Sequence, residues 1–234
     1  HKYKLPLLNA GVTPALISYV CSKLINVYPV VVPLGIGVKP YFNHLVVEER
    51  DLGPSNCLTS GRSMSRERVL NLYKRGLSIG KSSKQPVLIS ESVPGGTTTA
   101  QAVMEAFGLR VSNLVGSSLY KAPRSLRRKV VQKGLLNANL KTDSNSFEVV
   151  ASVGDPFQAF SMGLLIGARL ANQPVILSGG SQMIAVILLV LEILDVKNKV
   201  NFIENVFIAT TGWLVKDNSL NELLNLINEK YDVN

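Results

Sequence analysis

The chain has 234 residues, of which 46% are hydrophobic and 18% charged, and its formal net charge is +9. This composition excludes a disordered chain, and the length allows one domain with a large core over residues 1–234. Two cysteines cannot support a disulfide scaffold, and their spacing matches no metal site. The longest apolar run, Met183 to Leu194, contains Glu192 and is shorter than the about 20 residues of a membrane span. We therefore expect a cytoplasmic protein without a metal.

Short β-branched runs bounded by glycine, proline or polar residues predict six strands. In chain order these are Val27–Val32, Leu45–Glu48, Pro86–Ser90, Phe147–Val153, Pro174–Ser178 and Asn205–Thr210. Apolar residues at helical spacing predict helices over 69–77, 100–107, 125–138, 157–171, 182–194 and 220–227. The last of these helices begins with a predicted capping box of Ser219 and Glu222.

The alternation of strands and helices predicts an α/β fold with a mostly parallel sheet and helices on both faces, in three layers. In such sheets ligands bind beyond the carboxyl ends of the strands. The strand-to-helix loops are therefore where a functional site is expected.

The loop after the predicted strand Pro86–Ser90 has the clearest signal of an anion site. Its helix start carries two glycines and three threonines, namely Gly95, Gly96, Thr97, Thr98 and Thr99. Glycine allows close backbone approach, and the free amides and dipole of a helix N-terminus favour a phosphate. A simple turn with a helix cap would need only one glycine and one threonine. Glu91 opens the same loop and could bind ribose or a base nitrogen, or serve only as a partner of the helix cap.

Two further loops extend this prediction. In Gly154-Asp155-Pro156 the aspartate could hydrogen-bond ribose, or serve only as an N-cap with proline at the first helical position. After the predicted strand Pro174–Ser178, the run Gly179-Gly180-Ser181 resembles the first loop in kind. It predicts a second contact to the same ligand, with a tight turn for close helix packing as the alternative.

The positive charge is concentrated in one segment, because no acidic residue lies between Glu105 and Asp143. Its basic residues are Arg110, Lys121, Arg124, Arg127, Arg128, Lys129, Lys133 and Lys141, and the loop Gly116-Ser117-Ser118 leads into it. A solvated helix face would explain most of them, and a phosphate site would need only one or two. A nucleic-acid scaffold is the third interpretation, which the lack of interleaved aromatic residues disfavours.

Four segments together resemble a known family. They are Thr59–Met64, Glu91–Ala100, Gly154–Gln158 and Gly179–Met183. In this order they resemble the nicotinate-nucleotide-dimethylbenzimidazole phosphoribosyltransferases. The stretch Pro-Gly-Gly-Thr-Thr-Thr within them is typical of a divergent branch of that family, found in cyanobacteria and archaea.

The resemblance implies a Rossmann-like fold, a homodimer and an activity without a cofactor. It implies transfer of phosphoribosyl from nicotinate mononucleotide to a lower-ligand base, either dimethylbenzimidazole or a purine such as adenine. The products, an α-ribotide and nicotinate, would serve assembly of the cobamide nucleotide loop. The expected partners are these small molecules, and neither nucleic acid nor a membrane.

The resemblance also assigns residues, and the loop analysis adds Thr99 and Asp155 to them. The predicted phosphate- and ribose-binding set is Gly95, Gly96, Thr97, Thr98, Thr99, Ser117, Ser118, Arg127, Asp155, Gly179, Gly180 and Ser181. The family's catalytic glutamate lies in a glycine-rich segment near the C-terminus that has no counterpart here. Either that segment is missing from this chain, or the branch uses another general base, for which Glu91 is the candidate. The N- and C-terminal parts of the family's small domain are expected to be absent from this chain. The alternative function is a non-catalytic nucleotide-binding or regulatory protein on the same fold.

Overall fold

The computed structural model describes residues 7–8, 11–12, 14–38, 40–49, 52–116 and 123–233. The chain divides into two compact units, one of His1–Pro33 with Val38–Val47, and one of Leu34–Gly37 with Glu48–Asn234. Of the helices in the described ranges, none has the length and apolar character to cross a membrane. The expectation of a single domain stays a prediction.

The smaller unit contains one pair of very short strands and one helix. β1 (Leu7–Leu8) pairs antiparallel with β2 (Gly11–Val12), and α1 spans Pro14–Leu24. The strands predicted at 27–32 and 45–48 do not form. Between these two segments one backbone hydrogen bond is present, from Leu45 N to Val31 O at 2.9 Å. Strand propensity was not enough there, because a strand needs hydrogen-bonded partners along its length.

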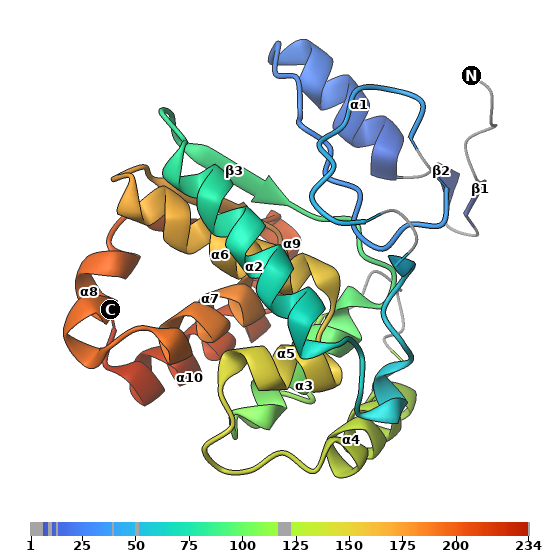
Figure 1. Ribbon diagram of the computed structural model, residues 1–234, viewed down its shortest axis with the longest axis vertical. Coiled ribbons are helices and arrows are strands. Elements are labelled where there is room, and N and C mark those ends of the chain that lie inside the picture. The colour runs from blue at the N-terminus through green and yellow to red at the C-terminus, as the bar shows by residue number, and fades with distance from the viewer. Residues whose placement is uncertain are drawn as a thin grey trace. The chain divides into compact units, whose positions relative to one another are not determined.

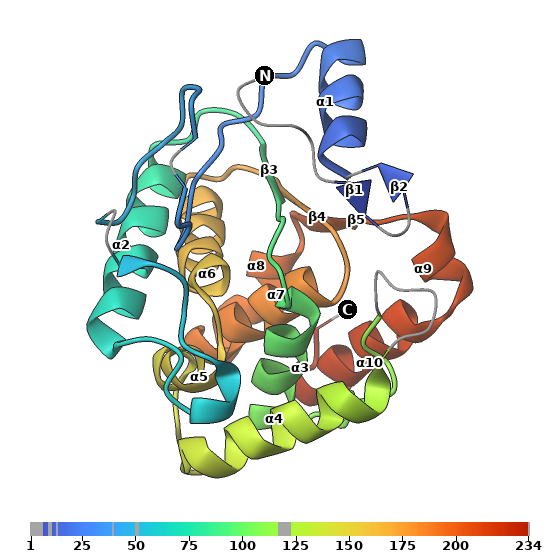
Figure 2. The same ribbon diagram turned by 90° about the vertical axis from the view of Figure 1, so that its right-hand side faces the viewer.

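The larger unit (Figure 1) is built on a parallel sheet with the strand order β3–β4–β5 (Figure 2). β3 spans Val87–Ser90, β4 spans Val175–Ser178 and β5 spans Val206–Ala209. The register pairs the last residues of the three strands with one another, so all three chains leave the sheet at the same edge. These three strands confirm the corresponding predictions, and the α/β class with a parallel sheet is confirmed with them.

The helices of this unit mostly follow the predicted order. They are α2 (Arg66–Lys81), α3 (Gly96–Ala106), α4 (Arg124–Ala138), α5 (Ser146–Val153), α6 (Pro156–Leu170), α7 (Ser181–Ile193), α8 (Val196–Ile203), α9 (Gly212–Lys216) and α10 (Ser219–Tyr231), with a 3-10 turn, η2, at Leu58–Ser60. The predicted capping box of α10 is wrong. Asn218 is the N-cap, and the Ser219 hydroxyl donates to Asp217 instead.

One predicted strand, Phe147–Val153, is a helix. α5 starts at a capping box, in which the Asn145 side chain accepts the N–H of Glu148 and the Glu148 carboxylate accepts the N–H of Asn145. Valines form most of its buried side. The cap and the burial of one helical face outweigh the strand propensity of valine. The loop that contains Asp155 therefore joins two helices rather than a strand and a helix.

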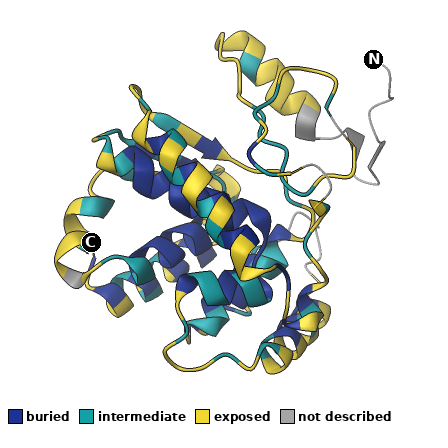
Figure 3. Ribbon diagram, viewed as in Figure 1, coloured by how far each residue is buried: buried dark blue, intermediate teal, exposed yellow. Residues whose placement is uncertain are grey.

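The core of the larger unit lies among α2, α6 and α7, where most of α6 and α7 is buried (Figure 3). α2 and α6 lie side by side (Figure 1). Four glycines, Gly76 and Gly80 on α2 and Gly163 and Gly167 on α6, face the backbone of the other helix. A methyl group at any of the four would come inside contact distance of main-chain atoms across the interface. The spacing of these two helices thus depends on the absence of four side chains.

The two faces of the sheet differ in burial. Side chains at alternate positions of a strand point to opposite faces. Ile89, Val175 and Leu177 are buried, whereas Leu88 and Phe207 are 62% and 51% exposed. Within the described part of the chain, helices therefore cover the two faces unequally.

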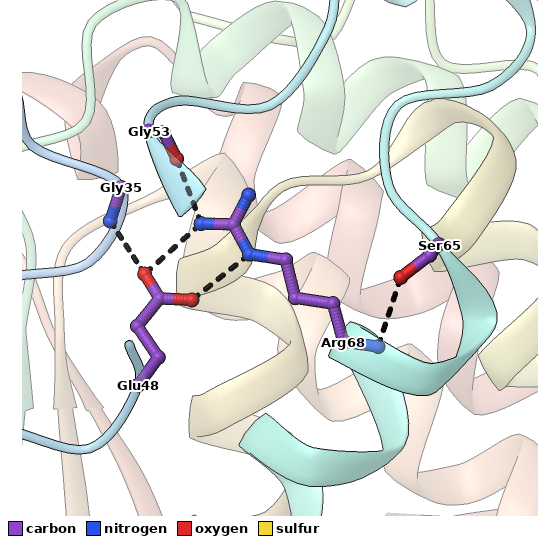
Figure 4. Close-up of polar contacts among 5 residues, drawn as sticks. All are labelled: Gly35, Glu48, Gly53, Ser65 and Arg68. Carbon is purple, nitrogen blue, oxygen red and sulfur yellow. Dashed lines mark hydrogen bonds and ion pairs between the residues drawn. The ribbon is translucent and has the colours of Figure 1, made fainter. Parts of the chain in front are cut away.

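A buried ion pair ties the start of the larger unit together (Figure 4). Arg68, in the first turn of α2, donates from Nε and Nη2 to the two carboxylate oxygens of Glu48, at 2.9 and 3.0 Å. The same carboxylate accepts the Gly35 N–H at 2.6 Å, and Arg68 Nη2 also donates to Gly53 O at 2.8 Å. Both charged side chains are only 8% exposed. The pair therefore fixes the segments around residues 35, 48 and 53 to α2.

Candidate functional site

The glycine–threonine turn links β3 to α3 at the carboxyl edge of the sheet. Gly95 is the N-cap of α3, and its left-handed φ of 78° favours glycine. Gly96 is buried, and a Cβ atom there would lie 2.8 Å from Gln182 Nε2. The backbone conformation thus favours glycine at position 95, and at position 96 a side chain would displace Gln182. No side chain caps α3, but two of its first-turn amides are already used: the Gly96 N–H donates to Val93 O at 3.0 Å and the Thr98 N–H donates to Gly95 O at 2.8 Å. The Thr97 N–H, which lies between them, is the amide of this turn that an anion would bind.

The turn after β4 repeats this arrangement. Gly180 is the N-cap of α7, again without a side-chain cap, and the Ser181 hydroxyl accepts the Gly116 N–H at 3.4 Å. Ser90 and Ser178 are paired in neighbouring parallel strands, so α3 and α7 begin at the same edge. The N-cap side chains of Ser65, Asn145 and Asp155 cap α2, α5 and α6, whereas α4, α8, α9 and α10 also lack a side-chain cap. What distinguishes α3 and α7 is that both start at a glycine N-cap, on neighbouring strands, at the edge where such sheets bind ligands.

Asp155 connects α3 and α7 through side-chain hydrogen bonds. It is the N-cap of α6, with proline at the first helical position, and is only 2% exposed. Its Oδ2 accepts from Thr99 Oγ1 at 2.5 Å and from Gln182 Nε2 at 2.9 Å, and its Oδ1 accepts the Gln158 N–H at 3.0 Å. Burial raises the pKa of the Asp155 carboxyl, and these hydrogen bonds oppose the shift. Both oxygens are used within the protein, and the ribose contact of Asp155 stays a prediction.

Two buried glutamines complete this cluster, and the sequence interpretation assigned them no role. Gln158 Nε2 donates to Gln182 Oε1 at 2.7 Å, and Gln158 Oε1 accepts the Asp155 N–H at 3.2 Å. Gln182 lies directly against Gly96. Their position in the sequence could have indicated this role, because each glutamine follows a predicted site residue within the first turn of a helix.

Glu91 follows β3 directly and is exposed. Its Oε2 accepts the Val93 N–H at 2.6 Å. Partial desolvation raises the pKa of the Glu91 carboxyl, the Val93 hydrogen bond lowers it, and the neighbouring Asp155 carboxyl raises it again. The two carboxyl groups therefore interact at this edge, and Glu91 is the one that solvent can reach.

Arg127 is buried on α4, with 4% of its surface exposed. Its Nε donates to Gln101 Oε1 at 2.8 Å, its Nη1 to Gly116 O at 2.8 Å and its Nη2 to Val115 O at 2.6 Å. The guanidinium thus links α4, α3 and the segment that ends at residue 116. The phosphate contact predicted for Arg127 stays a prediction.

The rest of the basic segment lies on the surface. The exposed basic residues are Arg110, Arg124, Arg128, Lys129, Lys133 and Lys141. This agrees with the interpretation as a solvated helix face for most of them. Ser117, Ser118 and Lys121 lie outside the described residues.

The segment Thr59–Met64 has a packing role. Gly61 has a left-handed φ of 66°, and a side chain there would collide with the backbone at the end of α4. Met64 N donates to Ala151 O at 2.9 Å on α5. Elsewhere, a shallow hollow of ≈ 380 Å³ between the ends of α3 and α4 contains none of the predicted site residues. Within the described ranges, no group of three or more His, Cys, Asp or Glu is placed to hold a metal ion.

A parallel sheet with two uncapped, glycine-started helices at its carboxyl edge is typical of proteins that bind phosphate-bearing ligands. A family model described as phosphoribosyltransferase matches residues 15–198, which is most of the chain. The chain belongs to this family, that of the nicotinate-nucleotide-dimethylbenzimidazole phosphoribosyltransferases, and to a divergent branch of it.

Its relatives carry the name UPF0284 protein. One from Prochlorococcus marinus strain MIT 9312 is 88% identical over 234 residues, which are 100% of this chain and 61% of that protein. One from Parasynechococcus marenigrum strain WH8102 is 42% identical over 213 residues, 91% of this chain and 53% of that protein. One from Crocosphaera subtropica is 32% identical over 226 residues, 93% of this chain and 60% of that protein. The chain spans between 53% and 61% of the length of these curated relatives.

Two solved structures share the fold. CobT from Thermus thermophilus has a TM-score of 0.65 and 18% identity, covering 86% of this chain and 61% of that one. A nicotinate-nucleotide-dimethylbenzimidazole phosphoribosyltransferase from the same organism has a TM-score of 0.63 and 18% identity, covering 90% of this chain and 66% of that one. At this identity the similarity shows the fold.

Proposed function

We propose that this chain carries the nucleotide site of a phosphoribosyltransferase of cobamide synthesis. The reaction moves phosphoribosyl from nicotinate mononucleotide to a lower-ligand base, dimethylbenzimidazole or a purine such as adenine, and releases nicotinate and an α-ribotide. One observation carries the proposal: α3 and α7 start at glycines without side-chain caps, side by side at the carboxyl edge of the sheet. Membership of the family supports the reaction class.

In this proposal the phosphate of the nucleotide binds between the two helix starts. The contacting residues are Gly95, Gly96, Thr97 and Thr98 at one start, and Gly179, Gly180 and Ser181 at the other. Free amides and both helix dipoles favour the anion there. Anchoring the phosphate positions the ribose and draws binding energy from a part of the substrate that does not react.

The chemistry then depends mainly on alignment. A nitrogen of the acceptor base attacks the anomeric carbon on the face opposite nicotinate, and the bond to nicotinate breaks as the new bond forms. The charge that develops on the ribose is stabilised by groups already in place. Glu91 takes the proton that the acceptor base loses, and its raised pKa makes it a stronger base than an ordinary glutamate.

The remaining predicted residues support this site. Arg127 holds the segment at residues 115–116 through hydrogen bonds to its carbonyl oxygens, and in this proposal its positive charge attracts the phosphate. Ser117 and Ser118 continue that segment and line the same pocket. Asp155 and Thr99 lie beneath the ribose and phosphate positions. A cytoplasmic homodimer without a cofactor completes the proposal.

The proposal is tested by the thermal unfolding of this chain with nicotinate mononucleotide, and with nicotinamide mononucleotide and inorganic phosphate as controls. A ligand that binds only the folded state raises Tm once its concentration exceeds Kd. We expect a rise with nicotinate mononucleotide that exceeds the rise with either control. An unchanged Tm at millimolar nucleotide would refute the nucleotide site.

A second assay separates the enzyme from the non-catalytic alternative. The full-length protein is incubated with nicotinate mononucleotide and dimethylbenzimidazole or adenine, and release of nicotinate is measured. Turnover supports the transferase. Binding without turnover of any base would favour a nucleotide-binding or regulatory protein.

A further inference from the structure

The Asp155 carboxyl is enclosed by three helix starts and has no cationic partner. It lies at the start of α6, is in hydrogen-bond contact with the Thr99 hydroxyl on α3 and accepts a hydrogen bond from Gln182 on α7. Among the described residues, none of its hydrogen-bond partners is a lysine, arginine or histidine. A carboxylate that is 2% exposed and unpaired is costly to keep charged.

The direction of the hydrogen bonds around Asp155 follows from one backbone group. Asp155 N–H can only donate, so the Gln158 atom that it meets is the carbonyl oxygen, Oε1. Gln158 therefore offers its Nε2 to Gln182, which must accept through Oε1. Gln182 then turns its own Nε2 to Asp155 Oδ2. Each carboxyl oxygen of Asp155 thus accepts an N–H group. For one further contact of Asp155 the donor and the acceptor still have to be assigned.

That contact is between Asp155 Oδ2 and Thr99 Oγ1, at 2.5 Å. Thr99 Oγ1 also lies 3.0 Å from the carbonyl oxygen of Gly96. A hydroxyl has one proton and can fill only one of these two contacts. If Asp155 were ionised, Thr99 would donate its only hydroxyl proton to Asp155. The contact between Thr99 Oγ1 and the Gly96 carbonyl would then be between two oxygens without a proton. A proton on Asp155 satisfies both contacts.

We propose that Asp155 is an uncharged carboxylic acid in the folded protein and a positioning residue of the nucleotide site. Its Oδ2–H donates to Thr99 Oγ1, and the Thr99 hydroxyl in turn donates its hydrogen bond to the Gly96 carbonyl oxygen. One neutral group thereby joins the starts of α3, α6 and α7, which present the two glycine turns. The positioning part of this inference rests on the proposed function, because it assumes that these turns bind the nucleotide.

The surrounding charges agree with this assignment. The neighbouring elements offer Asp155 uncharged side chains, Thr99 from α3 and Gln158 and Gln182 from α6 and α7, and Glu91 after β3 is the titratable group that interacts with it. Like-charged carboxylates disfavour each other's ionisation, and the buried carboxyl loses more solvation by ionising than the exposed one. A neutral Asp155 also braces the turns without repelling a phosphate bound on their other side.

The protonation is tested on the ligand-free chain by carbon-13 NMR of labelled aspartate carboxyls. We expect one aspartate signal to stay at the position of the protonated acid at pH 7 and to disappear in Asp155→Asn. Asp195→Asn is the matched control, because Asp195 is an exposed N-cap without a side-chain cap bond. The other described aspartates are exposed, so the wild-type spectrum decides even if Asp155→Asn does not fold. Ionisation of every aspartate below pH 5 would overturn the assignment.

The pH dependence of stability has a definite sign. A carboxyl whose pKa is raised by folding binds more protons in the folded state. Its contribution is complete below the unfolded-state pKa of about 4 and is lost as the pH rises through the folded-state pKa. The stability of the wild type relative to Asp155→Asn should therefore fall with rising pH. A relative stability that rises with pH would contradict a neutral Asp155.

The positioning role is tested with Thr99→Val and Thr99→Ser. We expect Thr99→Val to raise the Kd for nicotinate mononucleotide roughly tenfold, whereas Thr99→Ser keeps the hydroxyl and binds within about twofold of the wild type. In the wild type, binding should weaken at the pH where the Asp155 signal titrates. Equal binding by Thr99→Val and the wild type would overturn the role. If the wild type binds no nucleotide, the proposed function and the positioning role both fail, while the NMR result still decides the protonation.

Discussion

The interface between α2 and α6 makes a sharp stability prediction at Gly163. In Gly163→Ala the new methyl would stand 2.9 Å from the Tyr73 carbonyl carbon and closer still to its oxygen, whereas ordinary contact begins at 3.4 Å. The clash is with backbone, which cannot rotate away as a side chain can. The carbon contact alone requires the two helices to separate by about half an ångström, and the closer oxygen contact requires more, in a core that is close-packed.

The cost follows from two opposing effects. Overpacking of a core costs about 1–3 kcal/mol, and here the same helix spacing also serves the contacts of Gly76, Gly80 and Gly167. Alanine in place of glycine returns up to about 1 kcal/mol of helix propensity. We expect a net loss of about 2 kcal/mol, which lowers Tm by about 4–8 °C for a chain of this size.

The assay is thermal or urea unfolding of Gly163→Ala beside Gly212→Ala. Gly212 opens α9, and no atom lies within 4 Å of the position of an added methyl. The control should change Tm little or raise it slightly. If Gly163→Ala unfolds at the same temperature as the control, the reasoning from close glycine contacts is refuted.

Three further predictions concern named side chains. Arg68→Met leaves the buried Glu48 carboxylate without its partner and should lower the free energy of unfolding in urea by about 3–5 kcal/mol. The control Arg66→Met breaks a mostly exposed ion pair on the same helix and should cost at most about 1 kcal/mol. Equal losses would show that the buried pair does not stabilise the fold. Gly96→Val pushes against Gln182 and should abolish the nucleotide-dependent rise in Tm while costing about 1–3 kcal/mol; a normal rise would place the phosphate elsewhere. Glu91→Gln should slow turnover of the full-length protein by about 10²–10⁴-fold, and wild-type activity should increase with pH through the raised pKa of Glu91; unchanged turnover would exclude this base.

Local sequence signals predicted the parts of the fold that depend on local physics. The runs that became β3, β4 and β5 are short, β-branched and bounded by turn residues, and each is followed by a helix at a glycine or polar start. The same reasoning located Gly95, Gly96 and Gly180, because a tight strand-to-helix turn restricts which residues can stand there. It also predicted Asp155 and Pro156 as a helix start.

The wrong strand predictions have one cause in common. The runs at 27–32 and 45–48 have strand-like composition, but a strand forms only where another strand can pair with it. The valines of α5 favour a strand when they are considered alone, whereas the capping box of Asn145 and Glu148 favours a helix. Propensity describes one residue at a time, and both outcomes depended on partners.

Periodicity and backbone freedom, both readable along the chain, were enough to predict the class of fold and the glycine turns that follow β3 and β4. The roles of the polar side chains became visible only once the helices were packed. Packing enclosed Asp155 with Gln158 and Gln182, and it engaged Arg127 with main-chain carbonyls, through contacts between residues far apart in the chain. Such contacts leave no local pattern, since their partners are brought together only when the chain folds.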